Sequence, residues 1–327
     1  MNSLNQQSIQ KRSLRKNLVE VGLDHLINEI INDIQLSKLR WANKLTKIIT
    51  QISTMNPYKK KDIEENPSWQ SHAHLMWIEQ CCINFPLLYL SSIYLYIYAK
   101  QKGCDTFLFA TRDCCHWIKI FKKMFPGTNC HYFHCSRNMF KKAANEGNIA
   151  FKNYVKSVIG DDLERVIYVD IHGTGQNLFF YFEKEFGRVP HCLLLSAASL
   201  TYEKLPQICH LPYKTDHLEV LVFSAAGTPI EMLNYDLIGT LQDYTKHRGP
   251  LRDSPEYPLQ FLEPYHVCMN LLIDQIQPLR TRHLSGNKDH VLIHLANLIR
   301  KIYLIIQQNV PVIETYIQHQ VKHVNSV

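Results

Sequence analysis

The chain lacks the sequence features that mark several classes of protein. It has no long block of Lys or Arg of the kind that forms nucleic-acid-binding arms, although its formal net charge is +7. It shows no internal repeat and no low-complexity tract. Charged residues make up 20% and hydrophobic residues 46%, which excludes a disordered chain. We expect no nucleic-acid partner, and the mild basicity suits either an ordinary surface or an anionic ligand.

The ten cysteines occur without the context that disulfides require. Residues 1–18 are polar and contain no apolar stretch of a secretory signal, and no C-x-x-C spacing occurs. Two cysteine pairs are adjacent in sequence, Cys81-Cys82 and Cys114-Cys115. We therefore expect free thiols in a reducing, cytoplasmic environment.

Residues 82–99, CINFPLLYLSSIYLYIYA, are about long enough to cross a bilayer. The segment nevertheless carries Asn84, Pro86, two serines and four tyrosines, whose polar groups need partners. This composition favours a buried, aromatic-rich helix and predicts no membrane span.

Hydrophobic spacing divides the chain into three parts. Residues 14–55 carry apolar side chains at helical spacing, which predicts two amphipathic helices within an N-terminal element, 1–72. Residues 73–285 alternate helical patterns with short apolar strands, and 286–327 read as a C-terminal helical segment broken near Pro311. Strands alternating with helices predict an α/β fold with a mostly parallel sheet, flanked by N- and C-terminal helices.

Polar residues end the three clearest strands. FLFATRD ends in Arg112-Asp113, HYFHCSR ends in Ser136-Arg137, and VIYVD ends in Asp170. Ligands of such sheets bind beyond the carboxyl ends of the strands, so we expect these residues to meet at one edge.

The loop after Asp170 has the composition of an anion-binding turn. Gly173 and Gly175 leave main-chain amides open to an anion, and the helix that follows adds a positive N-terminal dipole. Thr174 and Asn177 add side-chain donors, whereas Asp170 suits ribose hydroxyls or a Mg²⁺ that accompanies pyrophosphate. A plain strand-to-helix turn capped by Asp170 is the alternative.

This loop resembles the phosphoribosyl-diphosphate loop of type I phosphoribosyltransferases, in which an apolar strand and two acids precede a T-T-G-x-T sequence. Asp170 falls on the second acid, Thr174-Gly175 on T-G, and Asn177 on the last Thr. Val169 and Gly173 stand at the first acid and the first Thr. FLFATRD is similar in place to the family's pyrophosphate loop, and YFHCSR to its flexible-loop strand. The resemblance covers roughly residues 104 to 200.

The resemblance implies a phosphoribosyltransferase-like sheet and a transferase of nucleotide metabolism that uses Mg²⁺. Its substrate would be phosphoribosyl diphosphate or a nucleotide, with pyrophosphate displaced from the anomeric carbon. The implied catalytic residues are Asp170, which would also contact Mg²⁺, Arg112 and Asp113. The implied substrate-binding residues are Gly173, Thr174, Gly175, Gln176, Asn177, Ser136 and Arg137. Val169 in place of the first acid weakens the grip on ribose, so a catalytically inactive phosphate-binding or interaction module is the main alternative.

A second resemblance concerns the order of the motifs along the chain. The aromatic helix, RD, SR and DIHGTGQ follow one another as in the module that accompanies some haloacid-dehalogenase-like proteins of bacterial surface-polysaccharide loci. Cys114 stands where that module has the glycine of R-D-G. The chain has no D-x-D motif, so the phosphatase half is absent.

Other motifs carry further alternatives. Cys114 and Cys115 precede a predicted helix, whose N-terminus would lower a thiol pKa, so a cysteine-dependent hydrolase stays open. DIHGTG is similar to the glycine loop of methyltransferases but one residue short, so a methyltransferase is a further alternative. The thiols and imidazoles of CHYFHC, 130–135, alternate faces on a strand, which disfavours zinc. Glu231 could be a carboxylate of the site, although such a residue more often caps a helix or faces solvent. Residues 248–258 are interpreted as a surface loop, a lid or the arm of a homodimer.

Overall fold

The structure is a computed structural model. It describes residues 12–13, 32, 41–58, 69–198, 214–224, 228–255, 257–280, 288–310 and 312–314.

A five-stranded sheet forms the centre of the molecule, and all of its strands are parallel. The strands are β2 (Thr106–Ala110), β3 (Asn129–Phe133), β4 (Val166–His172), β5 (His191–Ala198) and β6 (Leu218–Ser224). Their order across the sheet is β3-β2-β4-β5-β6. The chain therefore winds outward from β2 in both directions, as in doubly wound folds. This confirms the predicted α/β class.

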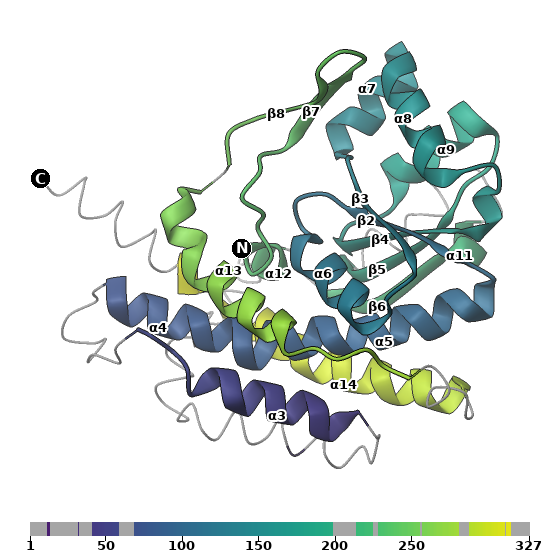
Figure 1. The fold of residues 1–327 in the computed structure, drawn as a ribbon. Coiled ribbons are helices and arrows are strands. Elements are labelled where there is room, and N and C mark those ends of the chain that lie inside the picture. The colour runs from purple at the N-terminus through teal and green to yellow at the C-terminus, as the bar shows by residue number, and fades with distance from the viewer. Residues whose placement is uncertain are drawn as a thin grey trace, which may run out of the picture.

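Helices cover both faces of the sheet (Figure 1). On one side α5 (Phe85–Lys102) and α14 (Lys288–Gln308) run side by side, together with α6 (Cys115–Met124). On the other side lie α7 (Arg137–Glu146), α8 (Ile149–Ile159) and α9 (Gln176–Phe186). The remaining helices are α3 (Ala42–Ser53), α4 (Trp69–Glu79), α11 (Lys214–His217), α12 (Thr228–Met232) and α13 (Leu259–Asp274).

The apolar segment 82–99 belongs to the core. Residues Trp69–Lys102 form one long helical run in which α4 and α5 are joined by a π-helical turn, Gln80–Asn84. The run is long and apolar enough to cross a bilayer, yet 94% of its most apolar window is buried within the protein. Sheet and helices therefore already cover the surface that a membrane would cover.

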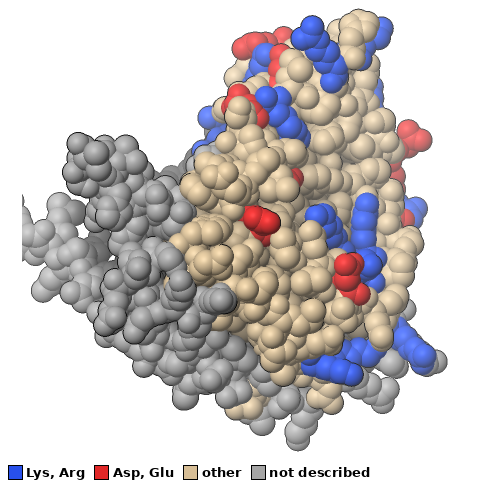
Figure 2. Space-filling model, turned by 60° about the vertical axis from the view of Figure 1, so that its left-hand side comes forward, with Lys and Arg blue, Asp and Glu red and all other residues tan. Residues whose placement is uncertain are grey.

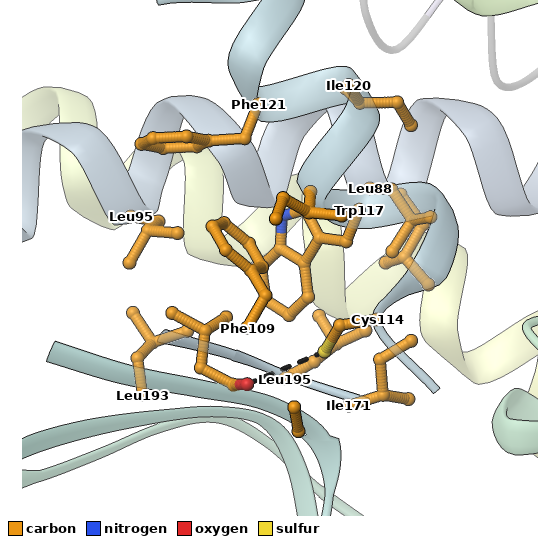
Figure 3. Packing of buried hydrophobic residues seen from close by; sticks show 14 of the residues in the cluster. Leu88, Leu95, Phe109, Cys114, Trp117, Ile120, Phe121, Ile171, Leu193 and Leu195 are labelled. Carbon is orange, nitrogen blue, oxygen red and sulfur yellow. Dashed lines mark hydrogen bonds between the residues drawn. The ribbon is translucent and has the colours of Figure 1, made fainter. Parts of the chain in front are cut away.

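Between α5, α6 and the sheet lies a layer of buried apolar and aromatic side chains (Figure 3). Trp117 of α6 and Phe109 of β2 meet edge to face, with centroids 6.0 Å apart. Leu193 and Leu195 of β5 point into the same layer, because alternate residues of a strand face the same side. Buried residues of α3, α5 and α14 join this cluster, so the three predicted sequence segments share one core, and their boundaries stay a prediction.

A β-hairpin extends over the carboxyl edge of the sheet. It pairs β7 (Leu241–Thr245) with β8 (Gly249–Arg252) in antiparallel fashion. Asp243 at its centre accepts hydrogen bonds from Lys142 of α7 at 2.8 Å and from Asn148 at 3.1 Å. A short parallel pair joins β1 (Arg12–Ser13) to β9 (Asn309–Val310).

Several element boundaries differ from those expected. Strand β3 ends at Phe133, so Ser136 and Arg137 begin α7 rather than ending a strand. Strand β4 continues to His172, which places Asp170 within the strand. Helix α3 confirms the second N-terminal amphipathic helix, whereas most of the first, like 315–323 at the other end, lies outside the described residues.

On the face shown in Figure 2, the Lys and Arg side chains of the described residues form separate small groups with uncharged surface between them. The described basic side chains of this face are thus spread out rather than gathered into one stripe.

Candidate functional site

A cavity of about 380 Å³ opens at the carboxyl ends of β2, β3 and β4. Strands β2 and β4 are neighbours from which the chain winds in opposite directions, and doubly wound sheets bind ligands at this point. The cavity brings together every residue that the sequence singled out as catalytic or substrate-binding. These are Arg112, Asp113, Ser136, Arg137, Asp170, Gly173, Thr174, Gly175, Gln176 and Asn177.

The turn between β4 and α9 presents the start of a helix to the cavity. Gly175 is the N-cap of α9 in the left-handed region at φ 69°, and a Cβ there would lie 3.0 Å from the ring of Phe179. The Gly173 amide donates to the Ser196 carbonyl at 3.2 Å, and the Gln176 amide donates to Thr174 Oγ1 at 3.2 Å. Among the described hydrogen bonds, the amides of Asn177 and Leu178 have no acceptor, so this helix start can accept an anion.

Asp170 lies in the cavity with its carboxyl held by neighbours on its own strand. Oδ2 accepts from the Tyr168 hydroxyl at 3.0 Å, and Oδ1 accepts from the Ile171 amide at 2.8 Å. Burial of the carboxyl, the nearby charge of Asp113 and, more weakly, that of Glu231 raise its pKa to about 8. The two hydrogen bonds oppose this rise. Asp170 therefore holds a proton over most of the neutral range unless a cation or donor joins it.

Arg112 and Asp113 form a fixed ion pair at the end of β2. Arg112 has φ 80°, a left-handed conformation that a side chain as long as arginine rarely adopts. Its amide donates to the Tyr132 hydroxyl at 2.9 Å, Nε donates to Asp113 Oδ1 at 3.1 Å, and Nη1 donates to Thr240 Oγ1 at 3.1 Å. These contacts hold the strained residue in place at the cavity wall.

Ser136 has a structural role that its place in sequence did not reveal. Its Oγ caps α7 by accepting from the Met139 amide at 3.0 Å and donates to the Leu241 carbonyl of β7 at 2.6 Å. Arg137 follows it, is exposed, and lines the cavity. Arg137 is thus the better ligand contact of the two.

The cavity also contains residues that the sequence analysis did not place among the predicted site residues. Glu231 and Arg252 both line the cavity, which agrees with the less favoured alternative of a site carboxylate for Glu231, whereas Arg252 lies in a segment expected to be mainly a surface loop. Arg252 Nη1 donates to the Gly239 carbonyl at 2.9 Å, and Nη2 lies 2.8 Å from His134 Nδ1. His172 also lines the cavity, and burial together with the charge of Arg137 lowers its pKa. The only sequence signals were an acid after a strand and two arginines in a Pro-rich segment.

The adjacent thiols lie apart from this chemistry. Cys114 points into the hydrophobic layer of Figure 3, where its Sγ donates to the Val169 carbonyl at 3.5 Å. Burial raises the pKa of both Cys114 and Cys115 well above the ordinary range, so neither thiol ionises at neutral pH. Their surroundings do not favour the cysteine-nucleophile alternative.

The acids of the cavity fit a hard divalent cation. Asp170, Asp113 and Glu231 line the same space, and the charges of the latter two raise the pKa of the first. Mg²⁺ is commonly held by one or two carboxylates together with substrate phosphate oxygens. Asp170 and Asp113 can supply such a pair.

Comparison with known proteins adds no assignment to this geometry. No protein-family model matches the chain. A search of curated proteins likewise finds none that is similar.

Proposed function

We propose that the cavity binds a phosphorylated ribosyl compound with Mg²⁺ and that the protein is a phosphoribosyltransferase-like enzyme. One observation carries the proposal: Asp170, the start of α9 and the Arg112-Asp113 pair all line the same cavity at the switch point of the sheet. This combination offers a carboxylate for sugar hydroxyls, an amide-lined anion site and a guanidinium for a second phosphate.

Each part of such a ligand has a counterpart in the cavity. The amides at the start of α9, with Thr174 and Asn177 beside them, would hold the terminal phosphate. Asp170 would accept from the ribose hydroxyls. Arg112, with Arg137 and Arg252, would hold a diphosphate, and Asp170 and Asp113 would hold Mg²⁺. The bound cation would neutralise charge on the leaving diphosphate.

The reaction that these residues would support is displacement of pyrophosphate from the anomeric carbon. The bond from that carbon to the diphosphate oxygen breaks, and an acceptor atom forms a new bond through an oxocarbenium-like state. The arginines stabilise the negative charge that develops on the diphosphate, and the anion site fixes the other end of the sugar. Catalysis of this kind requires positioned charges rather than a protein nucleophile. We place the reaction in the cytoplasm, because nine described cysteines are free thiols.

A second candidate function is a binding module without turnover. Val169, which stands where the resembling family has its first acid, is fully buried in the hydrophobic cluster. Tyr168, Asp170 and His172 face the cavity instead, because alternate side chains of β4 point to the same side. A carboxylate at position 169 would thus not enter the cavity. Strand β4 therefore offers the sugar a single carboxylate, that of Asp170.

Thermal shift and calorimetric titration with phosphoribosyl diphosphate, ribose 5-phosphate and pyrophosphate, each with and without Mg²⁺, test the binding proposal. We expect phosphoribosyl diphosphate with Mg²⁺ to bind most tightly and Asp170→Asn to weaken it by about tenfold or more, a loss of about 1.4 kcal/mol. Asn129→Ala, an exposed change on the far end of β3, serves as the control.

Pyrophosphate release in the presence of nucleobases then separates the two functions. Release that Asp170→Asn abolishes supports the transferase, and tight binding without release supports the binding module. Failure of all three ligands to bind would contradict both.

A further inference from the structure

A second cluster of reactive side chains lies outside the candidate active site. Cys115 and His116 begin α6, and His266 lies on the neighbouring helix α13. Their exposed fractions are 4%, 0% and 8%. One potential ligand atom from each residue lies within 4.8 Å of the other two. None of the three lines the cavity described above.

His116 carries a polar ring that the protein leaves unsatisfied. Among the residues that the structure describes, neither Nδ1 nor Nε2 has a hydrogen-bond partner, although both atoms are buried. The ring centroid lies 4.6 Å from that of His266, at an interplanar angle of 56°. Burial lowers the pKa of His116 well below its ordinary value, and the charges of His266 and Lys119 act in the same direction. A buried imidazole without any partner is costly unless an ion or another group completes it.

The other two side chains are already oriented by main-chain carbonyls. His266 Nε2 lies 2.8 Å from the Tyr235 carbonyl, which a protonated Nε2 satisfies, leaving the Nδ1 lone pair free for another bond. Cys115 Sγ lies 3.4 Å from the Asn234 carbonyl. Histidines that bind metals are commonly oriented in this way, with the second ring nitrogen on a carbonyl or carboxylate.

We propose that Cys115, His116 and His266 form a Zn²⁺ site that ties the start of α6 to α13. One thiolate and two imidazoles are the donors that Zn²⁺ prefers, whereas Mg²⁺ prefers oxygen. Donors of a tetrahedral zinc lie roughly 3.3–3.8 Å apart at bond lengths of about 2.0–2.3 Å, so small side-chain rotations close the present arrangement. Binding replaces the thiol proton, which leaves to solvent, and a water molecule fills the fourth position.

The charge of the site is balanced by acids close by. A bound Zn²⁺ with one thiolate leaves a net charge of +1, which is costly in a buried position. Among nearby charges, that of Asp236 raises the pKa of the Cys115 thiol most, and that of Asp113 raises it further. The positive charge of Lys119 lowers this pKa. The charge of Asp236 also raises the pKa of His266, so this carboxylate favours a positive charge at the site.

Titration of the metal-free, full-length protein with Co²⁺, which reports thiolate ligation by a charge-transfer band in the near ultraviolet, tests the proposal. We expect one-to-one binding that Zn²⁺ displaces. Cys115→Ser should remove the band, and His116→Gln and His266→Gln should each weaken binding about tenfold or more. Cys114→Ser is the matched control, because this adjacent buried thiol donates to the sheet and not to the cluster.

Thermal unfolding in chelator and in Zn²⁺ separates metal binding from damage to the fold. Zn²⁺ should raise the melting temperature of the wild type and of Cys114→Ser, but not that of His116→Gln. The absence of a charge-transfer band in the wild type, or its persistence in Cys115→Ser, would overturn the proposal. So would equal stabilisation of the wild type and His116→Gln by Zn²⁺. If a variant does not fold, the wild-type spectrum and stoichiometry decide alone. Binding of phosphorylated ligands is measured separately, since this site does not depend on the cavity.

Discussion

At the scale of single residues, the two glycines of the β4–α9 turn have different reasons to be there. Gly175 adopts φ 69°, and a Cβ on it would approach the Phe179 ring to 3.0 Å. Gly173 has an ordinary φ, and its nearest contact would be Asp170 Oδ2 at 3.8 Å. Gly175 is thus required by the fold, whereas Gly173 keeps the space beside Asp170 open for a ligand.

Gly175→Ala should therefore lower the free energy of unfolding by about 1–2 kcal/mol, because alanine is strained in the left-handed region. Gly173→Ala should leave stability nearly unchanged and weaken ligand binding instead. Urea denaturation of the two variants and the wild type measures the difference. Equal destabilisation by both changes would contradict this assignment.

Asp170 also predicts a pH dependence of stability. Its pKa is raised from 3.8 to about 8, so between these values the folded protein holds a proton that the unfolded chain has lost. The contribution of Asp170 is therefore complete below about pH 4, and the free energy of unfolding falls as pH rises through about 8. Asp170→Asn removes the ionisable carboxyl. The free energy of unfolding of this variant, measured by denaturation between about pH 4 and 8, should therefore fall less with rising pH than that of the wild type.

Glu79 provides a comparison for this experiment. Burial raises its pKa to about 8 as well, but its carboxylate contacts Tyr265 and the Val312 amide, none of which lines the cavity. Glu79→Gln should change the pH dependence of stability without weakening phosphate binding. Parallel pH profiles for Asp170→Asn and the wild type would show that the Asp170 carboxyl ionises normally.

At the scale of elements, the cavity wall depends on how α7 is joined to the hairpin. Ser136 caps α7 and also donates to Leu241 of β7, so one hydroxyl connects the two elements. Ser136→Ala should cost about 1–2 kcal/mol of unfolding free energy through loss of the cap and of the bond to β7. Ser157→Ala, which removes only an exposed bond to the Tyr154 carbonyl, is the control for denaturation. An equal loss of unfolding free energy in Ser136→Ala and Ser157→Ala would contradict the role of Ser136 in joining α7 to β7.

At the scale of the whole molecule, a buried amide pair fixes the segment above the sheet. Asn84 of the π-helical turn and Asn234 each donate to the other's side-chain oxygen, at 3.0 and 3.1 Å, across 150 residues of sequence. Gln80 donates to the neighbouring Leu233 carbonyl at 2.5 Å. The segment held in this way continues from Glu231 to Thr240, which both line the cavity.

Asn234→Ala should therefore lower the free energy of unfolding by about 1–3 kcal/mol, because it removes both hydrogen bonds between the two buried amides, although Asn84 Nδ2 keeps its bond to Gln80. It should also loosen the 231–240 segment and weaken ligand binding. Urea denaturation and calorimetry measure the two effects. Asn129→Ala, which removes a partly buried bond to Thr106 at the opposite end of the sheet, is the control for the calorimetry and should leave ligand binding unchanged.

The strand and helix pattern was predictable because it depends on neighbours in sequence. Apolar runs such as FLFA and VIYV, each followed by helical spacing, were sufficient to predict the α/β class and the edge where Arg112, Asp170 and Gly175 meet. Boundaries were less predictable: Ser136 looked like the end of a strand but caps a helix, because its hydroxyl finds the Met139 amide.

The sequence by itself thus determined the class of fold and most of the polar residues at the carboxyl edge of the sheet. Only the tertiary structure decided that Val169 faces the core, that Glu231 and Arg252 join the cavity, and that His266 meets Cys115 and His116. The physical reason is that local hydrogen bonding and hydrophobic spacing shape each element. Contacts between distant segments form only when the buried faces of those elements pack into one core.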